Sequence, residues 1–98
     1  MTDNHYLDNL SALIRDYVKD HEVKIYLFGS RAKGTAHRLS DVDIGLLASK
    51  PLPISFIANL KEKIEESTIP YSVDIIDLST VDEAFQKKVL AEGIEWKD

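Results

Sequence analysis

The 98-residue sequence contains no cysteine, only four glycines and three prolines, and no long apolar run. Without cysteine the chain cannot form disulfides, Zn–thiolate sites, iron–sulfur clusters or a thiol nucleophile. No stretch reaches the roughly 18 consecutive apolar residues that a membrane-spanning helix needs. The first residues also lack a basic segment followed by an apolar one, so we expect no signal peptide and a cytoplasmic location.

Positively charged residues are in the minority, because the sequence has 12 Lys and Arg but 17 Asp and Glu. The net charge is −5. Proteins that bind nucleic acid or anionic membranes broadly rely on an excess of Lys and Arg. We therefore expect neither kind of bulk binding, while a local basic pocket for one nucleotide stays open. With 44% apolar and 30% charged residues the composition is that of a globular protein. We expect residues 1–98 to form one domain around one hydrophobic core.

Hydrophobic spacing predicts helices alternating with strands. Apolar residues recur every three to four positions in segments that predict amphipathic helices: 6–18, 57–66 and a segment that follows Thr80. Shorter apolar or alternating runs predict strands: 23–28, 41–47, 71–78 and a short edge strand at 94–96. Thr80 and Glu83 form a capping-box pattern, and Gly93 is a candidate left-handed helix stop. This order predicts an α/β (α+β) fold, a small sheet with helices packed on it.

A glycine-containing segment, Gly29-Ser30-Arg31-Ala32-Lys33-Gly34, directly follows the first predicted strand. Glycine permits a tight turn and lets the backbone approach a ligand closely. If a short helix starts at Ser30, its free N–H groups form an anion site, to which the Ser30 hydroxyl and the charges of Arg31 and Lys33 contribute. The alternatives are a plain turn at the end of the strand and, for Arg31 and Lys33, solvated charges.

Two carboxylates, Asp41 and Asp43, begin the next predicted strand, and Asp41 follows Ser30 by eleven residues. Strand side chains alternate, so both carboxylates point to the same face, about 6–7 Å apart along the chain. Neighbouring carboxylates repel each other unless a cation lies between them. Mg²⁺ prefers oxygen ligands and keeps waters and phosphates in its shell. The pair therefore predicts a metal site, and the alternative is the solvated face of an edge strand.

A third carboxylate would complete a two-metal site, and the third predicted strand offers Asp74 and Asp77. The two differ by three positions, so they face opposite sides of the sheet and only one can join Asp41 and Asp43. We choose Asp74, because apolar neighbours surround it in the strand and a charge there needs a partner or a metal. Asp77 lies at the strand end, where we expect a solvated carboxylate.

Together these segments resemble the minimal nucleotidyltransferase (MNT) family of the DNA polymerase β-like nucleotidyltransferase superfamily. That family's pattern is an apolar residue before Gly and then Gly or Ser, followed by Asp-x-Asp, and later an Asp between apolar residues. The matching segments here are 27–34, 40–44 and 73–77. The resemblance implies the polymerase β-like fold, a small mixed twisted sheet flanked by helices.

The resemblance also implies roles in nucleotidyl transfer. Gly29 and Ser30 would contact the β- and γ-phosphates of ATP or another NTP. Asp41 and Asp43 would bind Mg²⁺, of which two ions are expected, and Asp74 would help hold the second ion and activate the attacking hydroxyl. That hydroxyl attacks the α-phosphorus, and pyrophosphate leaves.

A partner protein is a further implication of the resemblance. Larger members of the superfamily carry a second, substrate-binding domain, which residues 1–98 do not contain. In smaller relatives a separate helical protein of the HEPN type takes that place, and such pairs act as toxin–antitoxin systems. The resemblance thus implies an MNT-type antitoxin that transfers AMP to a tyrosine of a HEPN ribonuclease and silences it.

Two alternatives to this function stay open. One is a non-catalytic antitoxin or regulatory subunit that occludes its partner. The other is a nucleotidyltransferase for a small molecule such as an aminoglycoside. In that case a homodimer could supply the missing substrate lobe.

Overall fold

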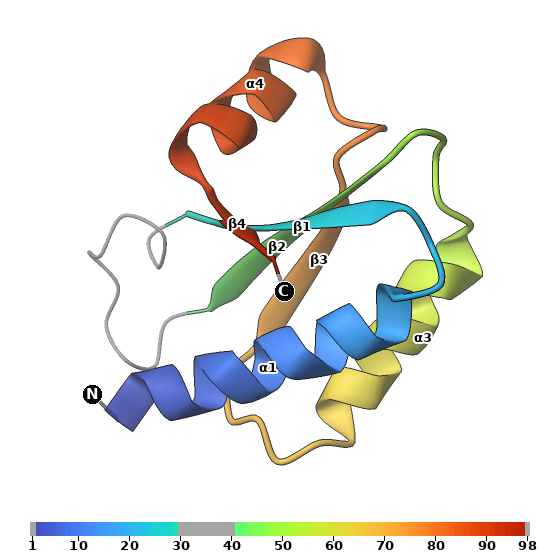
Figure 1. Ribbon diagram of the computed structural model, residues 1–98. Helices are drawn as coiled ribbons and strands as arrows, with labels where there is room; N and C mark the ends of the chain where they lie inside the picture. Colours follow the sequence, from blue (N-terminus) through green and yellow to red (C-terminus); the bar gives the residue numbers. More distant parts are fainter. Residues whose placement is uncertain (1, 30–40, 98) are drawn as a thin grey trace.

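The computed structural model describes residues 2–29 and 41–97, which form a four-stranded sheet with helices on both faces (Figure 1). The elements follow along the chain as α1 (Thr2–Val18), β1 (Val23–Phe28), β2 (Val42–Ala48), α3 (Ile54–Glu65), β3 (Val73–Asp77), α4 (Glu83–Glu92) and β4 (Ile94–Trp96). The predicted small mixed sheet flanked by helices is confirmed. None of the helices in the described part of the chain is long and apolar enough to cross a lipid bilayer.

The sheet has the strand order β3-β2-β1-β4. β1 is antiparallel to both β2 and β4, whereas β2 and β3 are parallel and are connected through α3, as parallel neighbours require a crossover. The end of β1 therefore meets the beginnings of β2 and β3 at one end of the sheet. All the predicted site residues that the structure describes lie at that end.

The larger part of the core lies between the sheet and the pair of helices α1 and α3, which Figure 1 shows side by side across one face. Alternation along the strands directs every second side chain of β1, β2 and β3 to this face. The buried residues of this core come from both helices and from β1, β2 and β3, and one of them precedes β3. They are Leu10, Ile14, Val18, Ile25, Leu27, Val42, Ile44, Leu46, Leu60, Ile64, Tyr71 and Ile75.

α4 covers part of the opposite face, where a smaller core forms from Tyr26, Leu78 and Val89. Leu78 follows β3 and packs over Gly45 of β2, since a Cβ added at Gly45 would lie 2.7 Å from Leu78 Cδ1. A side chain at Gly45 would displace Leu78 from this core. The same alternation that buries these residues also directs Asp43 to the α4 face of the sheet.

The ends of α4 differ from the prediction. The N-cap is Asp82, whose carboxylate accepts a hydrogen bond from Phe85 N at 2.8 Å, and not Thr80. The Thr80 hydroxyl instead donates to Asp77 O at 2.8 Å. The left-handed stop at Gly93 is also wrong, because its φ of −78° is ordinary and the chain continues directly into β4.

A matched pair of isoleucine substitutions tests this core. Ile44 is fully buried, whereas Ile54, at the start of α3, is 89% exposed. We expect Ile44→Ala to lower the free energy of unfolding by about 2–5 kcal/mol, because it removes buried apolar contacts and leaves a cavity. Ile54→Ala should change it by less than about 0.5 kcal/mol. Urea denaturation measures both, and similar losses for the two variants would contradict the described packing.

Candidate functional site

Gly29 directly follows β1 and adopts a left-handed backbone with φ +78°. In the antiparallel register Phe28 lies opposite Asp43, so the end of β1 runs beside the Asp43 side chain. A Cβ added at Gly29 would overlap Asp43 Oδ2. Glycine is thus required here both by the backbone angle and by the close approach of a carboxylate.

Two of the predicted carboxylates lie directly side by side across the parallel strands. Asp43 of β2 and Asp74 of β3 are register partners, so their side chains share the face that α4 partly covers. Asp41 precedes β2 and has the same parity as Asp43. Burial raises the pKa of Asp43, and the carboxylates of Asp74 and Asp41 raise it further. The structure therefore brings Asp41, Asp43 and Asp74 into electrostatic contact at one end of the sheet.

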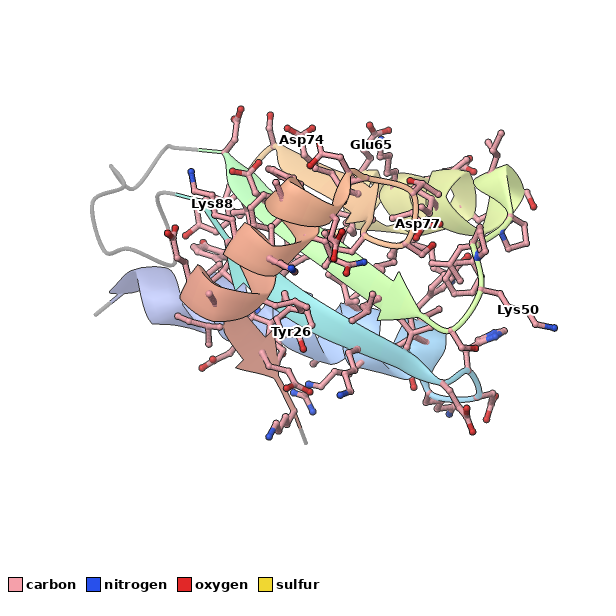
Figure 2. The ribbon with its side chains drawn as sticks, turned by 90° about the horizontal axis from the view of Figure 1, so that it is seen from above. Tyr26, Lys50, Glu65, Asp74, Asp77 and Lys88 are labelled. Carbon is pink, nitrogen blue, oxygen red and sulfur yellow. The ribbon has the colours of Figure 1, made fainter. Side chains whose placement is uncertain are left out.

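The burial expected for the two aspartates of β3 is wrong. Asp74 is exposed, whereas Asp77 is only 8% exposed. Figure 2 labels both at different points along this strand. Asp77 is hydrogen-bonded, accepting from Leu52 N at 2.8 Å and from Ser79 N and Oγ at 2.9 and 2.6 Å. Asp77 is a structural residue on the opposite face, and its partners explain how a carboxylate is buried there.

The remaining predicted site residues are Ser30, Arg31 and Lys33, and they lie outside the described residues. Their contacts with phosphate, and the short helix expected at Ser30, stay predictions. Of the predicted nucleotide-binding residues, the structure describes Gly29, which lies against Asp43.

The carboxylates fit a magnesium ion whose coordination shell would be completed by water and by a substrate. Within residues 2–29 and 41–97 no three Asp, Glu, His or Cys side chains are arranged to hold a metal by themselves. Mg²⁺ does not need such a cage, because it usually binds one or two carboxylates together with waters and phosphate oxygens. Asp43, half-buried and repelled by two neighbours, is a carboxylate that a divalent cation would stabilise.

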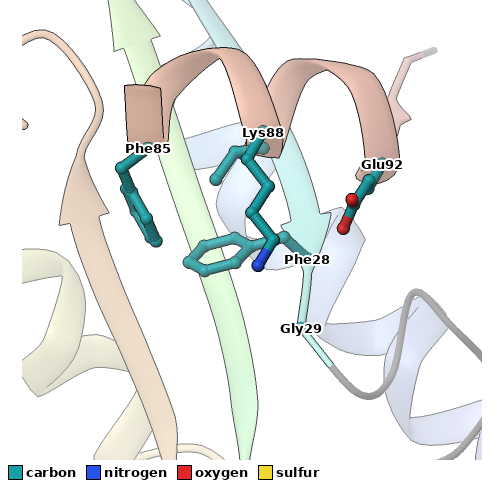
Figure 3. Close-up of a pocket in the computed structure, with 6 residues that line it drawn as sticks. Phe28, Gly29, Phe85, Lys88 and Glu92 are labelled. Carbon is teal, nitrogen blue, oxygen red and sulfur yellow. The ribbon is translucent and has the colours of Figure 1, made fainter. Parts of the chain in front are cut away.

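A pocket of about 190 Å³ lies beside the acidic group and was not predicted from the sequence. It is lined by Phe28, Gly29, Phe85, Lys88, Val89 and Glu92, and Figure 3 shows how α4 overhangs the end of β1 there. One feature of the sequence could have indicated this pocket. Residues 85, 88, 89 and 92 have the spacing of one helix face, which mixes apolar and charged side chains.

A double-mutant cycle tests the contact between Gly29 and Asp43. We expect Gly29→Ala to destabilise the wild type, because alanine is strained at this φ and its methyl group overlaps the carboxylate. In an Asp43→Ala background only the backbone strain remains, so the cost should fall by about 0.5–3 kcal/mol. Chemical denaturation gives both costs, and equal values would rule out the described contact.

Matched Asp→Asn variants separate the two kinds of aspartate. Because the pKa of Asp43 is raised, its ionisation destabilises the fold as the pH rises through that pKa. In metal-free buffer at pH 7, Asp43→Asn should therefore raise Tm by a few degrees. The gain should vanish below about pH 3, where the wild-type carboxyl is protonated in the folded and unfolded chain alike.

The control is Asp77→Asn, which should lower the free energy of unfolding by about 1–3 kcal/mol, because an amide cannot accept all three hydrogen bonds. Calorimetry across this pH range follows both variants. A lower Tm for Asp43→Asn at pH 7 would show that the carboxylate of Asp43 is stabilised by its surroundings and is not under repulsion.

Comparisons with known proteins identify relatives of this chain. A curated relative, the "Probable protein adenylyltransferase MntA" of Haemophilus influenzae, is 36% identical over 78 residues, which are 80% of this chain and 63% of the relative. The chain thus spans less than two thirds of that relative's length. A crystal structure of a toxin–antitoxin with AMP-PNP matches at 31% identity with a TM-score of 0.72, covering 89% of this chain and 72% of the matched one.

A second solved structure is a rebuilt and re-refined one of the tri-AMPylated Shewanella oneidensis HEPN toxin in complex with an MNT antitoxin. It matches at 25% identity with a TM-score of 0.70, covering 97% of this chain and 71% of the matched one. The sequence profile of the family described as "Polymerase beta, Nucleotidyltransferase" matches residues 13–96. Because this match runs from within α1 to the end of β4, the chain belongs to the polymerase β nucleotidyltransferase family.

Proposed function

We propose that this protein is a Mg²⁺-dependent adenylyltransferase that transfers AMP from ATP to a tyrosine hydroxyl of a HEPN-type partner and thereby acts as an antitoxin. The observation that carries the proposal is the group formed by Asp41, Asp43 and Asp74 beside Gly29. Further support comes from the names of the relatives, a protein adenylyltransferase and an AMPylated HEPN toxin bound to its antitoxin.

The proposed reaction is a displacement at the α-phosphorus of ATP. The acceptor oxygen forms a new bond to this phosphorus, the bond to the bridging oxygen of the β-phosphate breaks, and pyrophosphate leaves. When bound, Mg²⁺ neutralises the negative charge that the phosphate oxygens carry. The protein contributes mainly orientation and electrostatics, since this chemistry needs no covalent participation by a side chain.

Each acidic residue has a proposed task. Asp41 and Asp43 would hold Mg²⁺, because a separation of two positions in an extended chain places both carboxylates on the same face. Asp74 lies on the neighbouring strand and is exposed, so an acceptor hydroxyl from another molecule can reach it. We propose that Asp74 would help to hold a second Mg²⁺ ion and would accept the proton of the attacking hydroxyl.

The strand end beside these carboxylates is proposed to bind the phosphates. The space that a side chain at Gly29 would occupy holds the Asp43 carboxylate, so the Gly29 backbone lies close to any ligand bound at Asp43. Ser30, Arg31 and Lys33 follow immediately in the sequence and are proposed to supply a hydroxyl donor and two positive charges. Because ATP is the proposed substrate, we expect the activity in the cytoplasm.

A non-catalytic antitoxin that only occludes its partner is the second candidate. It is favoured by the solved structure of an MNT antitoxin in complex with its HEPN toxin, since a bound antitoxin can cover its partner without chemistry. The carboxylates of Asp41 and Asp74, however, raise the pKa of Asp43, a cost that a purely occluding surface would not need. A catalytic function therefore explains the grouping of the three carboxylates better than occlusion does.

Transfer to the partner tests the proposal. The protein is incubated with MgATP and a HEPN-type partner, and the partner's intact mass is followed for added AMP. We expect Asp43→Asn to slow transfer by about 100-fold or more, since it removes the negative charge that would hold Mg²⁺ beside the phosphates. Asp41→Asn/Asp43→Asn should abolish transfer and, if transfer is the antitoxic activity, neutralisation of the partner as well.

The control is Asp16→Asn/Asp20→Asn, which makes the same change in net charge near the far end of α1, at exposed positions. This variant should transfer AMP normally. Normal transfer by Asp41→Asn/Asp43→Asn would overturn the assigned site. Full neutralisation by that variant without transfer would favour occlusion as the function.

A further inference from the structure

The pocket between α4 and the end of β1 has aromatic walls. Phe28 and Phe85 contact each other edge to face, with ring centroids 5.8 Å apart and an interplanar angle of 83°. Both rings are half-buried against the small core on this face, so they are held in place without being covered completely. In an edge-to-face pair, one ring keeps both of its faces outside the contact, and such a face can stack with a flat heterocycle.

This pocket adjoins the acidic group through Gly29. Gly29 lines the pocket and also lies against Asp43. Phe28, the preceding residue, is the register partner of Asp43, so their side chains lie next to each other on one face of the sheet. A ligand whose phosphates lie beside Asp43 would therefore have its remaining part at the mouth of the pocket.

The volume indicates which part of a ligand the pocket takes. About 190 Å³ is below the roughly 300–1,000 Å³ of pockets that enclose a whole drug-sized molecule. It accommodates one flat heterocycle while the rest of the ligand stays outside. The rim also carries charge, since Lys88 and Glu92 extend from α4 toward Phe28 (Figure 3). A nucleobase combines a flat apolar face with polar edges and suits such a lining.

We propose that the Phe28–Phe85 pocket binds the purine base of the nucleotide substrate, by stacking on this aromatic pair. Lys88 lies at the rim, where its ammonium group donates to an acceptor on the purine edge. The inference rests on the proposed function, because it uses the triphosphate at Asp41 and Asp43 to bring the base to the pocket. The aromatic pair then makes the protein select a purine nucleotide over a bare polyphosphate.

Binding affinities of three ligands test this inference without any acceptor. Isothermal calorimetry in the presence of Mg²⁺ measures ATP, UTP and inorganic tripolyphosphate on the full chain. Wild type should bind ATP about five-fold or more tightly than either of the others, because stacking of a base on an aromatic ring is worth that factor and purines stack more extensively. Phe85→Leu should abolish the preference and leave tripolyphosphate binding unchanged.

Two variants show whether the aromatic ring itself matters. Phe85→Tyr keeps the ring and should keep the preference for ATP, whereas Phe85→Leu keeps only apolar volume. Phe56→Leu is the matched control, because Phe56 is half-buried in the other core and its ring packs against Tyr17 at 5.0 Å. This control should bind all three ligands as wild type does.

The outcomes that overturn the inference are distinct. If wild type binds ATP, UTP and tripolyphosphate equally, the base pocket is wrong, while the phosphate and metal site of the proposed function stands. If Phe85→Leu keeps the preference, or Phe85→Tyr loses it, stacking on this pair is wrong. If none of the three ligands binds, the proposed function fails and the base pocket fails with it.

Discussion

The register between β1, β2 and β3 is the constraint on which the candidate site depends. It sets Phe28 opposite Asp43 and Asp43 opposite Asp74, so that three strands contribute to one end of one face. A slip of one residue would turn Asp43 to the other face of the sheet. The slip is prevented because Val42, Ile44 and Leu46 would then leave the core beneath α1 and α3. The residues that stabilise the fold thus also hold the carboxylates in position.

The acidic group is an unfavourable arrangement that the rest of the fold offsets. A half-buried carboxylate beside two others lowers stability, whereas Asp77, buried more deeply, is stabilised by its hydrogen-bond donors. The same residue type therefore has opposite effects at Asp43 of β2 and at Asp77 of β3. Such local cost is common at sites that bind a charged ligand, and it agrees with the Mg²⁺ binding proposed for these carboxylates.

Much of the fold was predictable because its signals are local. Alternation and helical spacing each report that one face of an element is apolar, and this was enough to find every helix and strand that the structure describes. Strand order and register are not local, and they alone bring Asp74 beside Asp43. The burial of Asp77 was missed because one of its donors, Leu52 N, is 25 residues away in the sequence.

The details of the last helix were unpredictable for a similar reason. Thr80 and Asp82 are both suitable N-caps, and the choice between them is made by the Thr80 hydroxyl, which donates to Asp77 O. The pocket could not be predicted without knowing that α4 lies over the end of β1. From the sequence alone, the helical spacing of Phe85 indicates only a core residue. The helical pattern contained Lys88, but no local signal distinguishes a lysine at a pocket rim from one in bulk water.

The attachment of α4 has a consequence for how the pocket would work. The helix is fastened at its start through the Asp82 cap and the bond from Gln86 Nε2 to Leu78 O, and at its end by β4, which pairs with β1 from Ile25 to Leu27. Both walls of the pocket therefore belong to one hydrogen-bonded frame. A ligand would bind in a preformed pocket, so the protein would lose little conformational entropy on binding. Selectivity between ligands would then come from shape complementarity more than from a closing movement of the protein.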